Sequence, residues 1–209
     1  GLADDTWFIF AGDHGEMNLE HNLVFKSSFF EPSLRVPLIV AGPGVKAGRV
    51  VETPVSLVDL YPTVAELANM PVGAELDGTS LAASLGGDDS GLPGEVFAQY
   101  HANDIATGGF MLRDDRWKYV RYPGYPDQLF DLAADPGELN NLAGTRTDVR
   151  EAMERRLRTY VDPEAVDAEA KASDRAHFRA WRESVSRNDY VEELSKLYGS
   201  WDAEKDAVV

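Results

Sequence analysis

Residues 6–26 read TWFIFAGDHGEMNLEHNLVFK, and residues 27–41 continue SSFFEPSLRVPLIVA. The apolar runs at residues 6–11 and 36–41 are short and bounded by polar or glycine residues, as in strands that a parallel sheet buries on both faces. Further apolar residues then recur at helical spacing until Pro71 and Gly73 end the pattern: Leu57, Leu60, Val64 and Leu67. Strand, loop, strand and helix in this order predict an α/β fold.

The pattern changes after a Gly-, Asp-, Ser- and Pro-rich stretch at residues 86–94. Four strand-like runs follow, EVFAQYH, GGFMLRDD, RWKYVRY and QLFDL, with a turn expected at Asp114-Asp115. Residues 148–160 have helical periodicity, and the chain is charged and helix-prone from residue 163. We therefore divide the chain into an α/β part (1–86), a small α+β subdomain with an antiparallel sheet (87–162) and a helical tail (163–209).

Charge and composition exclude several classes of partner. The chain has 209 residues, with 20 Lys and Arg against 36 Asp and Glu, which gives a formal net charge of −16. Nucleic-acid affinity depends on basic residues that displace counterions, so no nucleic-acid partner is expected. The absence of Cys excludes disulfides, thiolate metal sites and a cysteine nucleophile. Without an apolar run of about 18 residues, no membrane span is expected either.

The segment at residues 12–26 carries the candidate chemistry. Asp13 and His14 follow a predicted strand, at the edge where open α/β sheets bind ligands. Gly12 and Gly15 flank the pair and let the backbone turn sharply, so that adjacent oxygen and imidazole donors could share a metal ion. The alternative interpretation is an Asp that caps a turn beside a surface His.

Lys26 lies between Phe25 and the pair Phe29-Phe30 in the sequence. An aromatic environment would remove water from the ammonium group and strengthen its charge, which makes Lys26 a candidate anion clamp. The alternative is a surface lysine whose aliphatic stem covers apolar residues.

Several separated motifs resemble one family. They are AGDHGEMNLEHNLVFKSSFFEPSLRVPLIV, PVSLVDLYPTVAELANM, LDGTSL, MLRDDRWKYVRY and QLFDLAADPGELNNLA. In this order they cover about residues 4–145 and resemble type I sulfatases of the alkaline phosphatase superfamily, especially the bacterial arylsulfatase, choline sulfatase and phosphonate monoester hydrolase branches. The resemblance implies the C-terminal portion of a sulfatase/alkaline-phosphatase-like α/β sandwich, with a small antiparallel-sheet subdomain and a helical tail.

The resemblance also implies a metal-dependent sulfuric ester hydrolase and a role for each candidate residue. Asp13 and His14 match metal ligands, the second being Asn in many members and His in the branches named above. Lys26 matches the catalytic lysine that contacts a sulfate oxygen of the substrate. His21, in the same loop, and His101 are further candidates for substrate binding, and a core or surface histidine is the alternative interpretation of His101.

The cofactor that the resemblance implies is a divalent metal, Ca²⁺ as in the family, with Mn²⁺ or Zn²⁺ suggested by the imidazole of His14. The family's nucleophile is a formylglycine made from Cys or Ser in a C/S-x-P-x-R motif. Residues 33–35 resemble only the end of this motif, and the family's first pair of metal-binding aspartates has no match, because we interpret Asp4 and Asp5 as structural. The chain is therefore predicted to be the C-terminal part of a longer sulfatase and inactive alone.

Two alternatives stay open. The same constellation would suit a phosphonate or phosphodiester hydrolase, and a short chain could retain this part of the fold as a non-catalytic module. The expected partner is a small-molecule sulfate ester, and the C-terminal helices are a candidate contact in an oligomer. The compartment is also open, with a soluble protein of the bacterial cytoplasm or periplasm as the expectation.

Overall fold

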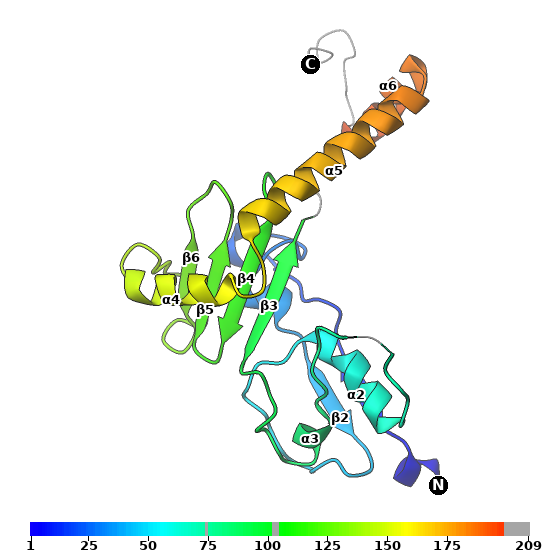
Figure 1. Cartoon of the computed structure of the whole chain (residues 1–209), viewed down its shortest axis with the longest axis vertical. Helices are drawn as coiled ribbons and strands as arrows, with labels where there is room; N and C mark the ends of the chain where they lie inside the picture. The colour runs from blue at the N-terminus through cyan, green and yellow to red at the C-terminus, as the bar shows by residue number, and fades with distance from the viewer. Residues whose placement is uncertain (74, 102–104, 199–209) are drawn as a thin grey trace. The chain divides into compact units, whose positions relative to one another are not determined.

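Two compact units make up the chain, Gly1–Pro163 and Glu164–Val209. The computed structural model describes residues 1–73, 75–101 and 105–198 (Figure 1). Within the first unit these residues form a two-stranded sheet, a four-stranded sheet and several short helices. The mixed α/β class with an antiparallel subdomain and a helical tail is as predicted. The three-part division of the chain at residues 86 and 162 stays a prediction.

The first sheet joins β1 (Phe8–Ala11) and β2 (Leu38–Ala41). The strands run antiparallel with Phe10 opposite Ile39, so the parallel pairing expected for these runs is wrong. The expected burial on both faces is wrong as well, because Phe8, Phe10 and Ile39 are 60%, 62% and 62% exposed. An apolar run predicts a strand, but the direction of its partner and the covering of its faces depend on other segments. Short helical turns accompany this sheet: η1 (Leu2–Asp5), η2 (Glu20–Asn22) and α1 (Glu31–Leu34).

The helix predicted after β2 is confirmed as a turn, η3 (Leu57–Asp59), that runs into α2 (Leu60–Leu67), and α3 (Ala82–Leu85) follows. The buried Asp59 carboxylate starts the helix by accepting the backbone N–H groups of Ser56 at 2.7 Å and Thr79 at 2.8 Å. Leu57 and Val64 of the apolar stripe stay 40% and 46% exposed. The helical period therefore predicted the helix, but not which face it buries.

The four predicted strand-like runs form one antiparallel sheet in chain order (Figure 1). Its strands are β3 (Glu95–Tyr100), β4 (Gly109–Asp114), β5 (Trp117–Arg121) and β6 (Gln128–Asp131). The turn between β4 and β5 lies where it was predicted. Asp114 stabilises this turn, because its carboxylate accepts the backbone N–H groups of Arg116 at 3.0 Å and Trp117 at 2.6 Å.

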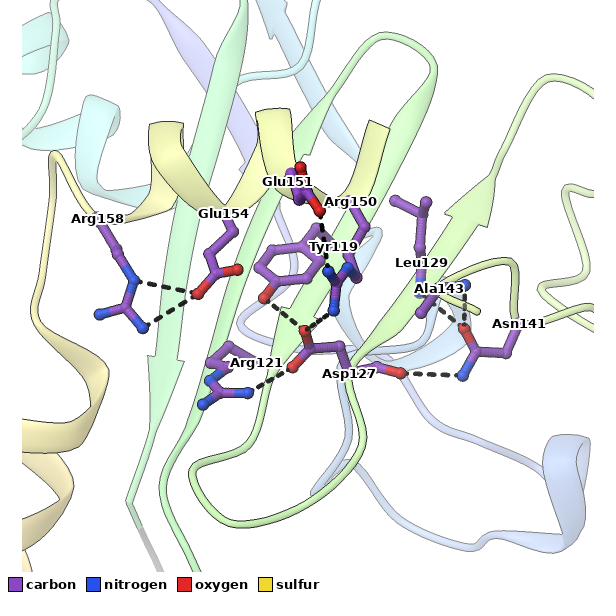
Figure 2. Close-up of polar contacts among 10 residues, drawn as sticks. All are labelled: Tyr119, Arg121, Asp127, Leu129, Asn141, Ala143, Arg150, Glu151, Glu154 and Arg158. Carbon is purple, nitrogen blue, oxygen red and sulfur yellow. Dashed lines mark hydrogen bonds and ion pairs between the residues drawn. The ribbon is translucent and has the colours of Figure 1, made fainter. Parts of the chain in front are cut away.

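Both faces of the four-stranded sheet are covered. On one face α4 (Thr147–Leu157) packs against β4 and β5 above Tyr119 (Figure 2). This helix contributes the buried Met153 and Leu157. On the other face Phe29 joins Met111 and Val120 in a buried cluster. Since Phe29 follows the candidate loop in the sequence, this packing attaches that loop to the sheet.

Helix α5 (Pro163–Ser184) begins at the last residue of the first unit, and together with α6 (Arg187–Tyr198) it contains most of the described residues of the second unit. Trp181 joins the two helices, because its ring centroid lies 5.7 Å from that of Phe178 and 5.6 Å from that of Tyr190. Across the described part of the chain, no helix combines the length and the apolar character needed to cross a membrane. An oligomer contact through these helices stays a prediction.

Asp127 is the central anion of a polar network beneath α4 (Figure 2). Its carboxylate accepts the Tyr119 hydroxyl at 3.0 Å and the Arg121 guanidinium at 2.8 Å, and Arg150 of α4 lies 3.8 Å away. Burial, followed by the charge of Asp127, raises the pKa of Tyr119, so the hydroxyl keeps its proton and donates. The Asp127 backbone carbonyl accepts the Asn141 side-chain amide at 3.0 Å, which connects the network to the loop after β6.

Asp127→Ala should lower the free energy of unfolding by about 1–3 kcal/mol, because the buried Tyr119 hydroxyl would lose its acceptor. Urea denaturation at neutral pH measures the loss. Asp115→Ala, at an exposed position in the β4–β5 turn, is the control and should change stability by less than about 0.5 kcal/mol. Equal stabilities of the two variants would contradict the role assigned to Asp127.

Candidate functional site

The loop between β1 and α1 brings three predicted site residues together. The Lys26 ammonium lies 2.7 Å from Nε2 of His14, and Oδ2 of Asp13 lies 3.4 Å from the same nitrogen. Oδ1 of Asp13 accepts the backbone N–H of His14 at 2.9 Å. A carboxylate, an imidazole and an ammonium group therefore converge at the carboxyl end of β1.

The hydrogen bonds of His14 determine which ring nitrogen can act as a ligand. Nδ1 lies 2.8 Å from the carbonyl oxygen of Gly15, which assigns the proton to Nδ1 and makes it the donor. Nε2 then carries the lone pair and accepts a hydrogen bond from Lys26. A second nitrogen fixed by a backbone carbonyl in this way is typical of metal-binding histidines.

Asp13 keeps its negative charge at this position. The backbone N–H of His14, followed by the backbone N–H of Asp13 itself, lowers the pKa of the Asp13 carboxyl. The side chain is 87% exposed, so both oxygens are accessible to a ligand.

The surroundings of Lys26 differ from the predicted aromatic pocket. Lys26 is exposed, and the neighbouring Phe25 is 70% exposed, so aromatic residues do not desolvate the ammonium group. Phe29 instead packs on the four-stranded sheet. The sequence neighbours of Lys26 point elsewhere because φ of Phe25 is +63°, a left-handed conformation that redirects the chain.

Gly12 and Gly15 are needed for close packing rather than for unusual backbone angles, since neither has a left-handed φ. A Cβ on Gly15 would lie 1.9 Å from the Pro32 carbonyl oxygen, and one on Gly12 would lie 3.3 Å from Cβ of Val36. The Gly15 N–H also donates to the Ser33 carbonyl at 2.7 Å. These glycines therefore matter, as predicted, but because there is little room for a side chain and not because the backbone turns sharply.

The chain between His14 and Lys26 forms a closed loop. Met17 is fully buried, and its N–H donates to the Phe25 carbonyl at 2.8 Å. Oε1 of Glu16 accepts the Phe25 N–H at 2.6 Å. Several non-glycine residues have a left-handed φ here: Asn18, Leu19, His21, Asn22 and Phe25. This closure returns the chain to Lys26 beside His14.

The other two predicted histidines make different contacts. His21 stacks on Phe30, with ring centroids 3.7 Å apart and planes 7° from parallel. His101 packs edge-on against Phe110 with centroids 5.1 Å apart, and among the described residues its buried Nε2 has no hydrogen-bond partner. The described contacts bring neither ring to Asp13 or Lys26, and a role of His21 or His101 in substrate binding stays a prediction.

The buried Ser33 holds both sides of the site, a role that the sequence pattern does not predict. Its hydroxyl donates a short hydrogen bond to the Lys26 carbonyl, and its own carbonyl accepts the Gly15 N–H. Ser33 is 1% exposed. The sequence signal for Ser33 is a small polar residue between Pro32 and Leu34.

A metal ion would find two candidate ligands here, Oδ2 of Asp13 and Nε2 of His14. Within residues 1–73, 75–101 and 105–198, no group of three or more His, Cys, Asp or Glu side chains is placed to hold a metal ion. A carboxylate and an imidazole fit Mn²⁺ or Zn²⁺ better than Ca²⁺, which prefers oxygen ligands. The described residues therefore fit part of a metal site.

A family assignment follows from comparison with known proteins. The family described as N-sulphoglucosamine sulphohydrolase, C-terminal, matches residues 19–162, which is more than half of the chain. The chain therefore belongs to this family, within the sulfatases and the alkaline phosphatase superfamily.

Individual relatives agree with this assignment. Arylsulfatase K from Danio rerio is 36% identical over 214 residues, which cover 99% of this chain and 41% of that protein. A solved 2-O GAG sulfatase is 31% identical with a TM-score of 0.67, covering 83% of this chain and 38% of its own. The phosphonate monoester hydrolase of Agrobacterium radiobacter is 34% identical with a TM-score of 0.68, covering 75% and 35%. The chain thus spans about two-fifths of the curated relatives' length, and since these arylsulfatases are animal proteins, they do not support the expected bacterial source.

Gly15→Ala should destabilise the loop and lower the free energy of unfolding by about 1–3 kcal/mol, because the added Cβ overlaps the Pro32 carbonyl. Thermal unfolding and proteolysis within residues 16–28 measure the two effects. Gly144→Ala is the control, since a Cβ there meets no atom within 4 Å and its φ is not left-handed. If both variants are as stable and as protease-resistant as the unmodified chain, the close approach at Gly15 is not required.

Proposed function

We propose that the protein containing this chain is a metal-dependent sulfuric ester hydrolase. The observation that carries the proposal is the convergence of Asp13, His14 and Lys26 in a single loop of a chain that belongs to the sulfatase family. In this proposal Asp13 and His14 are metal ligands, and Lys26 binds a sulfate oxygen of the substrate.

The geometry supports a division of labour between these residues. The Gly15 carbonyl holds the His14 proton on Nδ1, which keeps Nε2 available as a metal ligand. The Lys26 ammonium is within hydrogen-bond distance of Nε2, so Lys26 would have to release this nitrogen before a metal binds there. A sulfate oxygen bound to the released ammonium would then lie close to the metal. A divalent metal, when bound, would neutralise charge on the sulfate oxygens and acidify an attacking hydroxyl.

In this proposal, other parts of a longer protein supply the remaining chemistry. The chain has no Cys, and the described residues supply only two adjacent metal ligands. The curated relatives are more than twice as long. We therefore infer that the formylglycine nucleophile and further metal ligands come from outside these 209 residues, and that this chain alone is inactive.

The exposed apolar face of the first sheet is consistent with this division. Phe8, Phe10 and Ile39 would be costly to leave in water, since burying such a side chain contributes about 1.5–3 kcal/mol. The cleft that Asp13, His14 and Lys26 line has a volume of about 1720 Å³, beyond the roughly 300–1,000 Å³ of an ordinary ligand pocket. Phe8 and Phe10 do not line it, so further chain on the sheet would bury the apolar face, and further chain in the cleft would narrow it.

A phosphonate or phosphodiester hydrolase is the second candidate function. The specific observation in its favour is the 34% identity to the phosphonate monoester hydrolase of Agrobacterium radiobacter, at a TM-score of 0.68. Sulfate and phosphonate esters both present anionic oxygens that Lys26 and a metal would bind. The residues of this loop therefore do not discriminate between the two substrates.

An assay of the full-length protein on matched aryl sulfate and aryl phosphonate esters distinguishes the two functions. We expect a higher kcat/KM for the sulfate ester, and no turnover of either ester by the 209-residue chain alone. Hydrolysis of the phosphonate ester without any hydrolysis of sulfate esters would reject the leading proposal in favour of the second.

Replacement of the ligating and anion-binding residues tests their roles. In the full-length enzyme Asp13→Ala should abolish metal-dependent turnover. Lys26→Ala should raise KM and lower kcat together, with kcat/KM reduced by roughly 10²–10³-fold, because a positive charge at the developing anion is lost. Lys196→Ala, which removes an exposed lysine of α6, is the matched control. Unchanged kinetics in Lys26→Ala would remove this residue from the site.

A further inference from the structure

Three segments that are distant in the sequence meet at the buried side chain of Lys118. Its ammonium donates to the Phe29 carbonyl at 2.9 Å and forms ion pairs of 2.7 Å with Oε1 of Glu31 and with Oε1 of Glu138. Lys118 is fully buried. The Phe29 carbonyl accepts one hydrogen bond from the ammonium, and the two carboxylates contribute ion pairs.

The charges of this cluster balance. Nε of Arg113 lies 3.4 Å from Oε1 of Glu31, so two cations, Lys118 and Arg113, face two anions, Glu31 and Glu138. The side chains of Lys118 and Glu138 are 0% and 1% exposed, and that of Glu31 is 14% exposed. Because water cannot replace a lost partner at such burial, each charge depends on the others for solvation.

Glu138 occupies an unfavourable backbone conformation to reach this cluster. Its φ is +54°, a left-handed value that is sterically costly for a residue with a side chain. In this conformation Oε2 of Glu138 accepts the backbone N–H of Glu31 at 2.7 Å, while Oε1 pairs with Lys118. The Glu138 carboxylate thus pairs with Lys118, which also pairs with the Glu31 side chain. It also accepts the first backbone N–H of α1.

A continuous path of contacts runs from the cluster to the candidate site. Lys118 and Glu138 hold the start of α1 through Phe29 and Glu31. On α1, Ser33 binds the Lys26 carbonyl through its hydroxyl and the Gly15 N–H through its carbonyl. The two segments that carry Lys26 and His14 are therefore both attached to a helix that the buried cluster holds in place.

We propose that the cluster of Lys118, Glu31 and Glu138 positions Lys26 relative to His14 through α1 and Ser33. These are positioning residues, since the described contacts bring none of the three to Asp13, His14 or Lys26. The motifs RWKYVRY, FFEPSLR and DPGELNN each contribute one charged member of this cluster. Only the effect of this positioning on turnover rests on the proposed function.

Hydrogen exchange in the ligand-free 209-residue chain tests the positioning without any assay of activity. In Glu138→Gln we expect the N–H groups of Gly15 and Met17, which close the loop, to exchange roughly 2- to 30-fold faster, the range of coupling that such networks carry. Glu95→Gln is the matched control, because it makes the same chemical change in a partly buried ion pair with Arg156. Equal exchange of the two loop amides in both variants would overturn the proposal.

A charge-balanced variant guards against a general loss of folding. Lys118→Met combined with Glu138→Gln leaves Glu31 paired with Arg113, so no buried charge is left without a partner. We expect this variant to keep the sheet, as judged by circular dichroism, and still to show the faster exchange at Gly15 and Met17. A folded double variant with unchanged exchange would contradict the positioning role.

A double-mutant cycle in the full-length enzyme tests the connection to Lys26. Glu138→Gln should lower kcat/KM by roughly 2- to 30-fold in the unmodified enzyme, and much less in a Lys26→Ala background, because its effect is transmitted through Lys26. Additive effects of the two substitutions would reject this connection. An enzyme without sulfatase activity would instead reject the proposed function, and the exchange experiment would still decide the positioning.

Discussion

The buried ammonium of Lys118 ties the segment that carries the candidate site to the four-stranded sheet. It reaches the Phe29 carbonyl and the carboxylates of Glu31 and Glu138, which come from opposite ends of the first unit's sequence. The packing of Phe29 against Met111 and Val120 adds an apolar contact at the same place. The ion pairs and the apolar contact together attach the site loop to the four-stranded sheet.

The site itself depends on short-range backbone chemistry. The Gly15 carbonyl directs the His14 imidazole, the His14 N–H lowers the pKa of Asp13, and Ser33 binds the chain on both sides. The ammonium of Lys26 then lies in the field of Asp13 within a chain of net charge −16. In the proposed function an anionic substrate approaching such a surface would need a local concentration of positive charge, which Lys26 and the proposed metal would supply.

Local sequence patterns predicted much of the regular structure. The runs at residues 95–132 became the four strands β3 to β6, the Asp114 turn fell where expected, and helical spacing placed α2 and α4. In the site, adjacency placed His14 beside Asp13, while the meeting with Lys26 rested on the family resemblance. These successes concern interactions within a few residues, or patterns that the chemistry of one segment sets by itself.

The sequence by itself therefore determined where the strands and helices form and which side chains in residues 12–26 have ligand chemistry. Only the tertiary structure decided that β1 and β2 are antiparallel, that Lys26 is exposed rather than desolvated, and that Ser33 and Lys118 hold the site in place. The reason is physical: period and composition record the preferences of one segment, whereas strand direction, burial and ion pairing depend on which distant segments fold against it.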